Sequence, residues 1–306
     1  MARIMTVQGA LEGTKMGYCQ MHEHVFVRAT PNSKKNPALE ISNEVLSAQE
    51  LKAYRSAGGM AILDAQPVGA GRDAAALERL SRESGVTIIT VTGYHLPGFY
   101  QAEHWIHSES KEQLQERFLQ ELQEGCEEAK NVRPGAVKAA IPASGPEGRF
   151  ETLIRSAAGA AAGADVPLIL HTEKGVGAVK AVKLCEQEGL DPKRIAVCHA
   201  DRQAEAYQPH EEIVRTGAYL EYDTIGRYKY HDDESERRLI LHMLEQGCIE
   251  RLLLSLDTTA ARLTSYGGEI GLDYMLKNFL PSLRAAGLSQ GEIDQITIEN
   301  PRRIFE

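Results

Sequence analysis

Eight short apolar segments, separated by longer stretches of helical periodicity, constrain the fold of this chain more than any other feature. Several of them, such as residues 88–91 and 168–170, are rich in Val, Ile and Leu and alternate little with polar residues. Strands of a parallel sheet have this pattern because both of their faces are buried. The predicted strands are residues 18–25, 60–65, 87–92, 136–141, 168–171, 195–199, 219–222 and 251–256.

Repeated alternation of strand and helix produces a parallel sheet, and eight such units favour a closed (β/α)8 TIM barrel over an open sheet. A chain of 306 residues is long enough for this barrel. No linker rich in Pro, Gly or Ser divides the sequence, so we expect a single domain over residues 1–306.

Local signals predict where several helices begin or end. Ser47 and Glu50 have the spacing of a capping box, and Ser108 or Ser110 can cap the long helix that follows them. Near the end of the chain, we expect Pro301 to break the last helix before a short terminal turn.

Six residues with metal-binding or acid–base side chains lie at or near the carboxyl ends of predicted strands. Active sites of such barrels are built at that end. His22 and His24 are two positions apart, so both side chains point to one face of their strand. Imidazole is a good ligand for zinc, iron, nickel and similar ions. The six residues are His22, His24, Lys138, His171, His199 and Asp257.

Each of these residues has a plainer explanation when it is taken alone. A histidine at a strand end is more often a hydrogen-bonded core or rim residue than a ligand. Lys138 could extend its ammonium to the rim, and Asp257 could cap the next helix. The joint pattern favours a metal site, because four of the ten histidines fall at strand ends together with a lysine and an aspartate.

Composition excludes several kinds of partner and site. The formal net charge of −9 argues against a nucleic-acid partner, since no long basic segment offsets it. The five cysteines contain no CxxC pair, which argues against a disulfide framework or a zinc knuckle. No segment is apolar enough to span a membrane and the N-terminus lacks a signal-peptide core, so we expect a cytoplasmic protein without a membrane partner.

These motifs resemble those of the phosphotriesterase-like proteins of the amidohydrolase superfamily. The matching features are Met-His-Glu-His at 21–24, Lys138, the two later histidines, Asp257 and Asn-Pro-Arg-Arg-Ile-Phe at 300–305. The resemblance extends over nearly the whole chain. It is highly specific for the family and weak for the substrate.

The resemblance implies two divalent metal ions, with His22, His24 and Asp257 holding one and His171 and His199 the other. Zinc is the first expectation, and Mn, Co, Fe or Ni are alternatives. It also implies that CO2 converts Lys138 to a carbamate. An ammonium group has donors only and cannot bind a cation, whereas a carbamate is anionic and has two oxygens that can bridge two ions.

The expected reaction follows from that pair of ions. A water that bridges two dications roughly 3.5–4 Å apart loses its proton near neutral pH. The hydroxide would attack a lactone or carboxylic ester, and Asp257 would pass the proton to the leaving group. The expected partner is a small-molecule substrate, and the assembly is left open, with a homodimer among the alternatives.

Substrate selection should depend on the loops that follow the strands. Lactonases of the family carry a tyrosine on the loop after strand three, and Tyr94 is the candidate for that position, although it could instead pack the rim. Arg227, Lys229 and Arg262 follow strands seven and eight and could bind a phosphate or carboxylate. They could equally be solvated charges, above all Lys229. Some family members hydrolyse phosphorylated sugar lactones, which these side chains would suit.

Two other functions remain open on the sequence. A phosphotriesterase or phosphodiesterase would use the same metals, since a hydroxide also attacks phosphorus. A barrel that binds a ligand without turning it over belongs to a different class, and the intact set of six residues argues against it.

Overall fold

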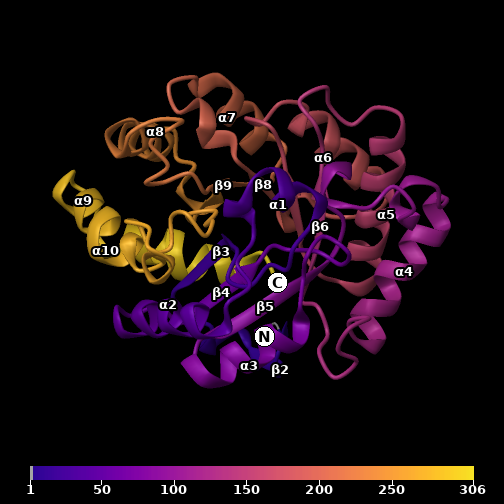
Figure 1. The fold of residues 1–306 in the computed structure, drawn as a ribbon. Coiled ribbons are helices and arrows are strands. Elements are labelled where there is room, and N and C mark those ends of the chain that lie inside the picture. The colour runs from indigo at the N-terminus through magenta and orange to yellow at the C-terminus, as the bar shows by residue number, and fades with distance from the viewer. Residues whose placement is uncertain (1–2) are drawn as a thin grey trace.

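The computed structural model describes residues 3–306 and contains the predicted barrel. Eight parallel strands lie in the order in which they occur in the chain, and helices surround them (Figure 1). All eight predicted strands are confirmed, with ends that differ by at most two residues. The strands are β3 (Cys19–Glu23), β4 (Ala61–Asp64), β5 (Thr87–Gly93), β6 (Ala136–Ala140), β7 (Leu168–His171), β8 (Ile195–Cys198), β9 (Tyr219–Tyr222) and β10 (Leu252–Leu254).

The ring closes where β10 meets β3, and side chains make much of this junction. The backbone N–H of His22 donates to Ser255 Oγ (2.9 Å), and the N–H of Leu256 donates to Glu23 Oε1 (2.7 Å). The N–H of Asp257 donates to the carbonyl of His22 (3.2 Å). The first strand and the segment after the last strand are therefore held together at the carboxyl end of the barrel.

Helices cover the outside of the sheet. Most follow a strand and return the chain to the start of the next one, as parallel strands require. The helices are α1 (Pro31–Lys35), α2 (Glu44–Ser56), α3 (Ala74–Ser84), α4 (Lys111–Glu124), α5 (Arg149–Ala164), α6 (Ala178–Gln187), α7 (Tyr207–Arg215), α8 (Asp233–Glu245), α9 (Leu280–Ala285), α10 (Gln290–Asp294) and α11 (Asn300–Arg303).

Two local expectations were wrong, and one is resolved. The cap of α2 is Asn43, whose Oδ1 accepts from the N–H of Val45 and Leu46, while Ser47 bonds to the Tyr266 hydroxyl instead. The capping-box spacing at residues 47–50 therefore lies inside a helix. Ser110, and not Ser108, caps α4.

Pro301 does not break the last helix. A π-helical turn, Gln295–Glu299, precedes it, and α11 continues through the proline to Arg303. An additional antiparallel hairpin near the N-terminus, β1 (Arg3–Thr6) with β2 (Gly9–Glu12), was not expected. Among residues 3–306, no helix combines the length and the apolar character needed to cross a membrane.

The strands are apolar on both faces because they separate two packed layers. Ile88 and Leu170 belong to the larger layer between sheet and helices, whereas Ile89, Ile169 and Leu253 fill the barrel interior. Neighbouring residues of a strand point to opposite faces, so each strand needs apolar residues in succession. This accounts for the uninterrupted apolar runs of the sequence.

One glycine links this packing to the chemistry at the strand ends. Gly93 ends β5 with a φ of +99°, and a Cβ at this position would lie 2.0 Å from the carbonyl oxygen of Lys138 on β6. We expect Gly93→Ala to destabilise the protein more than Gly189→Ala, a substitution at a similar φ of +89° with nothing within 4 Å of the added Cβ.

In the control, Gly189→Ala, the free energy of unfolding should fall by about 1–2 kcal/mol because of the backbone conformation alone. In Gly93→Ala it should fall by about 1–3 kcal/mol more because of the clash with the carbonyl oxygen of Lys138. Urea unfolding of both variants measures the difference. Equal losses would show that the close approach of the two strands does not matter.

Candidate active site

The six strand-end residues gather at the carboxyl end of the barrel. His22 lies in β3 and His24 directly after it, Lys138 lies in β6 and His171 ends β7. The other two, His199 and Asp257, follow β8 and β10. The imidazole rings form a continuous group, with centroids 5.5 Å apart for His22 and His24, 4.8 Å for His22 and His199 and 4.5 Å for His171 and His199.

His22, His24 and Asp257 form one candidate ligand set. One ligand atom from each lies within 4.8 Å of the others. His24 Nε2 is 3.4 Å and His22 Nε2 is 3.9 Å from Asp257 Oδ1. The two imidazoles and the carboxylate therefore face a common point, as the i, i+2 spacing of the histidines predicted.

His171 and His199 form the neighbouring pair. His199 Nε2 lies 2.8 Å from His171 Nδ1. Burial lowers the pKa of both rings, so both are neutral imidazoles at neutral pH. The neutral ring is the form that ligates metals.

Lys138 lies between these groups with no exposed surface, and its Nζ is 3.1 Å from His22 Nε2. Burial lowers the pKa of its amine. A neutral amine has a free electron pair, and only this form of the amine can react with CO2. The position is thus chemically suited to the modification that the family resemblance implies.

Asp223, which was not among the candidates predicted from the sequence, orients two of the histidines. It follows β9 and is fully buried, with Oδ1 2.6 Å from His199 Nδ1 and Oδ2 3.0 Å from His22 Nδ1. Burial alone would raise the pKa of its carboxyl, but the two imidazoles hold it well below the usual value. The carboxylate occupies the Nδ1 side of both rings, which leaves each Nε2 free to ligate an ion.

Two of the candidate ligands have an unusual backbone. His199 has a φ of +65° and Asp257 a φ of +48°, in the left-handed region that residues other than glycine rarely adopt. Such conformations cost energy and concentrate at functional sites. They support a functional interpretation of both residues, independently of their side chains.

A cavity of about 270 Å³ opens directly over this group. One wall is apolar, and Arg202, Arg227 and Glu173 are among its polar residues. Both arginines contact Oδ2 of Asp257. Arg202 does so through Nη2 at 3.2 Å, and Arg227 through Nη1. The apolar wall contains Val27, Leu39, Ile41, Leu96 and Phe99.

Of the four predicted substrate residues, the structure places only Arg227 at this cavity. Tyr94 is fully buried in the apolar layer outside the barrel. Successive residues of an extended segment face opposite sides, and it is the next residue, His95, that lines the cavity and stacks on Phe99 with ring centroids 3.9 Å apart.

Arg262 and Lys229 also lie elsewhere. Arg262 donates to backbone carbonyls, to that of Ile225 at 2.6 Å and to those of Leu256 and Asp257, so it ties together the loops after β9 and β10. Lys229 is exposed, and its Nζ lies 4.6 Å from the centroid of the Tyr230 ring. The cationic trio expected from the sequence is therefore not assembled, and Arg202 is the second arginine at the cavity.

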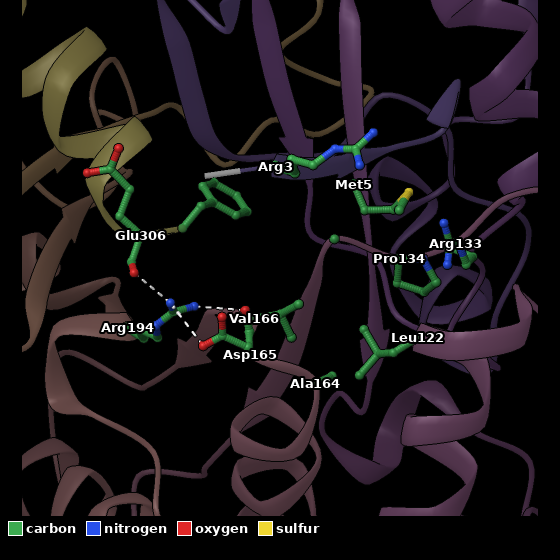
Figure 2. Close-up of a pocket in the computed structure, with 12 residues that line it drawn as sticks. Arg3, Met5, Leu122, Arg133, Pro134, Ala164, Asp165, Val166, Arg194 and Glu306 are labelled. Atoms are coloured by element: carbon green, nitrogen blue, oxygen red, sulfur yellow. Dashed lines mark hydrogen bonds and ion pairs between the residues drawn. The ribbon is translucent and has the colours of Figure 1, made fainter. Parts of the chain in front are cut away.

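A larger cavity, of about 870 Å³, lies at the opposite end of the barrel. Figure 2 shows Arg194 there, which donates to the backbone carbonyls of Asp165 (2.8 Å) and Glu306 (2.7 Å). Arg3 and Arg133 also line it. None of the six strand-end residues reaches this cavity. Many of its lining residues, such as Gly135, Val166 and Arg194, come just before a strand in the sequence and so lie at the amino end of the barrel. Its size therefore does not mark it as the active site.

Comparison with known proteins agrees with this arrangement. The sequence model of the phosphotriesterase family matches residues 2–305. A phospho-furanose lactonase of Mycoplasmopsis synoviae is 27% identical, over 98% of this chain and 90% of its own. An N-acetyltaurine hydrolase of Danio rerio is also 27% identical, over 98% of this chain and 97% of its own.

A solved structure gives the same result for the fold. The phosphotriesterase homology protein of Escherichia coli, complexed with phosphate in its active site, superimposes with a TM-score of 0.88 at 26% identity and covers 95% of this chain and 99% of its own. The match of the family over almost the entire chain shows that this protein is a hydrolase that belongs to the phosphotriesterase family, as its motifs predicted.

Proposed function

We propose that this protein is a two-metal hydrolase that cleaves a small, anionic lactone or carboxylic ester, such as a phosphorylated sugar lactone. One observation carries the proposal: four imidazoles, Lys138 and Asp257 converge beneath a cavity that Arg202 and Arg227 also line. The imidazoles supply ligands for divalent ions, and the arginines supply donors for an anionic group.

The donor set suits two divalent ions. Asp223 already occupies the Nδ1 side of His22 and His199, as carboxylates do for metal-ligating histidines. His22, His24 and Asp257 would hold one ion, and the remaining two histidines the other. We expect zinc, with Mn, Co, Fe or Ni as alternatives.

Lys138 would bridge the two ions as a carbamate. In its neutral form, the amine would form a bond to the carbon of CO2 and release one proton, which produces an anionic group with two oxygen ligands. Burial of the Lys138 side chain supports this modification in two ways. It favours the neutral form of the amine, and it excludes water that would compete with the carbamate oxygens for the ions.

Two bound dications would acidify a water and polarise the scissile carbonyl. Asp257 would then take up the proton at a carboxylate oxygen and deliver it to the leaving alkoxide. Burial alone would raise the pKa of its carboxyl, but Arg227 and His24 lower it well below the usual value. Asp257 is therefore ionised at neutral pH and able to accept a proton.

The cavity supports a substrate that is both small and anionic. Its volume of about 270 Å³ is just below the usual range for small-molecule sites. The side chains of Arg202 and Arg227 are only 7% and 13% exposed. Partly desolvated guanidinium groups bind phosphate, sulfonate or carboxylate through paired donors.

A second candidate reaction is hydrolysis of an anionic N-acyl amine. The N-acetyltaurine hydrolase relative matches nearly the whole chain, and the same two arginines would suit a sulfonate. Phosphotriesters form a third class for the same site. A panel of phosphorylated sugar lactones, neutral lactones, N-acyl aminosulfonates and phosphotriesters would rank the candidates by kcat/KM.

We expect Lys138→Ala to lose most of its bound metal and activity, because no other group at this position can bridge two ions. Short carboxylic acids such as formate or propionate should partly restore both by filling the space. Metal analysis and rates with and without the acids provide the measurement. Full metal occupancy and activity in Lys138→Ala would refute the bridging role.

Asp257→Asn keeps the shape of the side chain and removes its basicity. We expect kcat to fall on the order of a hundredfold or more, in line with the loss of general acid–base catalysis. Because Asp257 is also a candidate ligand, metal content must be measured beside the rate. A fully metallated variant with a normal rate would contradict the proton-transfer role.

Arg227→Ala should raise KM for anionic lactones about 10–100-fold, which corresponds to the loss of hydrogen bonds to a charged group. Neutral lactones should be nearly unaffected, and their kcat reports any effect transmitted through Asp257. Lys229→Ala, two residues away but exposed, is the matched control and should leave both KM values unchanged. Equal losses for neutral and anionic substrates would assign Arg227 to the structure of the site instead.

A further inference from the structure

A second group of metal-binding side chains lies outside the candidate active site, on the outer side of β8 and β9. It consists of Asp201, which follows β8, His231, which precedes α8, and Glu236 in the first turn of α8. One ligand atom from each lies within 4.8 Å of the other two. The six candidate active-site ligands do not include any of these residues.

Glu236 is the clearest indication that this group can bind a ligand. Its side chain is fully buried, and neither carboxylate oxygen has a hydrogen-bond partner among residues 3–306. Burial raises the pKa of its carboxyl, and the charges of Asp201, Asp223 and Asp233 raise it further. A carboxylate in such a place is costly unless a cation accompanies it.

Asp201 contributes a second free oxygen. Its Oδ2 accepts from the N–H of Thr224 (2.6 Å) and from the Thr224 hydroxyl (2.7 Å), but the buried Oδ1 has no hydrogen-bond partner in the described part of the chain. One oxygen of this carboxylate is thus fixed by the loop after β9. The other remains available for a ligand.

His231 presents a nitrogen to the two carboxylates. Its Nδ1 lies 3.1 Å from the carbonyl oxygen of Asp232, to which a hydrogen on this nitrogen would be donated. In that tautomer the electron pair of Nε2 faces Glu236 Oε2 at 3.2 Å and Thr224 Oγ1 at 3.1 Å. The Thr224 hydroxyl already donates to Asp201, so the Nε2 electron pair and the carboxylate oxygens would face one another without a positive charge.

A surface groove borders this group at His231. A groove of about 540 Å³ lies between the segment after β8 and the segment before α8, and Gln203, Tyr230, His231 and Ser235 are among its lining residues. His231 therefore lies at the boundary between the groove and the two buried carboxylates. An ion could enter from this side without passing through the candidate active site.

We propose that Asp201, His231 and Glu236 bind one divalent transition-metal ion, such as Zn²⁺ or Mn²⁺, separate from the active-site ions. Two carboxylates and a neutral imidazole carry a charge of −2, which one dication balances. Mixed nitrogen and oxygen donors are typical of such ions. With bonds of about 2.0–2.2 Å, two ligands of one ion lie at most about 4.4 Å apart, so small side-chain rotations suffice.

The ion would tie together the segment after β8 and the segment that runs from β9 into α8. Asp201 is adjacent to Arg202, and Thr224, which bonds to Asp201, lies three residues before Arg227. The bound ion would therefore fix the loops that carry both cavity arginines. Binding of this ion would be independent of which substrate the protein hydrolyses.

Anomalous diffraction from crystals of the unmodified protein soaked in Mn²⁺ tests the proposal directly. We expect a peak among Asp201, His231 and Glu236, in addition to any peak at the active site. Absence of that peak, with Mn²⁺ present at the active site or not, would overturn the proposal and would indicate a protonated cluster instead.

Metal analysis after dialysis against Mn²⁺ gives a second, independent measurement. Glu236→Gln and His231→Gln should each bind one equivalent less than the unmodified protein, and Glu205→Gln, which removes an exposed carboxylate lining the same groove, should bind the same amount. Adding Glu236→Gln to Lys138→Ala should remove one further equivalent, which separates this site from the active-site ions. Unchanged stoichiometry in folded Glu236→Gln and His231→Gln would overturn the proposal, and if neither variant folds, the crystal result decides.

Discussion

The closure of the barrel between β10 and β3 is the constraint on which the candidate site depends. His22 and Asp257 are separated by most of the chain, yet they belong to one candidate ligand set because the N–H of Asp257 donates to the carbonyl of His22. Glu23, which lies between His22 and His24 at the end of β3, accepts from the N–H groups of Leu256 (2.7 Å) and Thr258 (3.2 Å). The middle residue of His-Glu-His therefore joins the two ends of the sheet, while its neighbours face the cavity.

Two buried carboxylates, those of Asp223 and Asp257, further constrain the candidate site. Asp223 and Asp257 are both buried beside imidazoles, and the pKa of each carboxyl is low despite burial. Asp257 also has Arg202 and Arg227 as partners, whereas Asp223 contacts only the histidine side of the site. The two carboxylates thus have separate tasks: Asp223 orients rings, and Asp257 connects the candidate metal ligands with the arginines that would bind a substrate.

The sequence predicted the strands and their polar ends because both signals are local. An apolar run marks a strand, and the histidine or aspartate that follows it must lie at the carboxyl end. Asp223 carried the same signal, directly after 219–222, and could have been selected on that ground. The directions of longer side chains were not predictable. Tyr94 and His95 are neighbours in an extended segment, so their side chains point to opposite sides. Arg262 turns away from the cavity and donates to carbonyl groups that only the folded loops bring together.

The segments after β8 and β9 distribute their side chains in the same way, which relates the two clusters to each other. After β8, His199 faces the candidate active site and Arg202 reaches the cavity. Asp201, between them, belongs to the outer cluster that it forms with His231 and Glu236. After β9, Asp223 faces inward, Thr224 bonds to Asp201 and Arg227 reaches the cavity. Each segment therefore spans from the imidazoles to the outer cluster within four or five residues. Because the Thr224 hydroxyl and N–H both bond to one oxygen of Asp201, the two segments are joined at the outer cluster. A change in the ligation of Asp201 would consequently act on both arginines at once, without contact with the substrate.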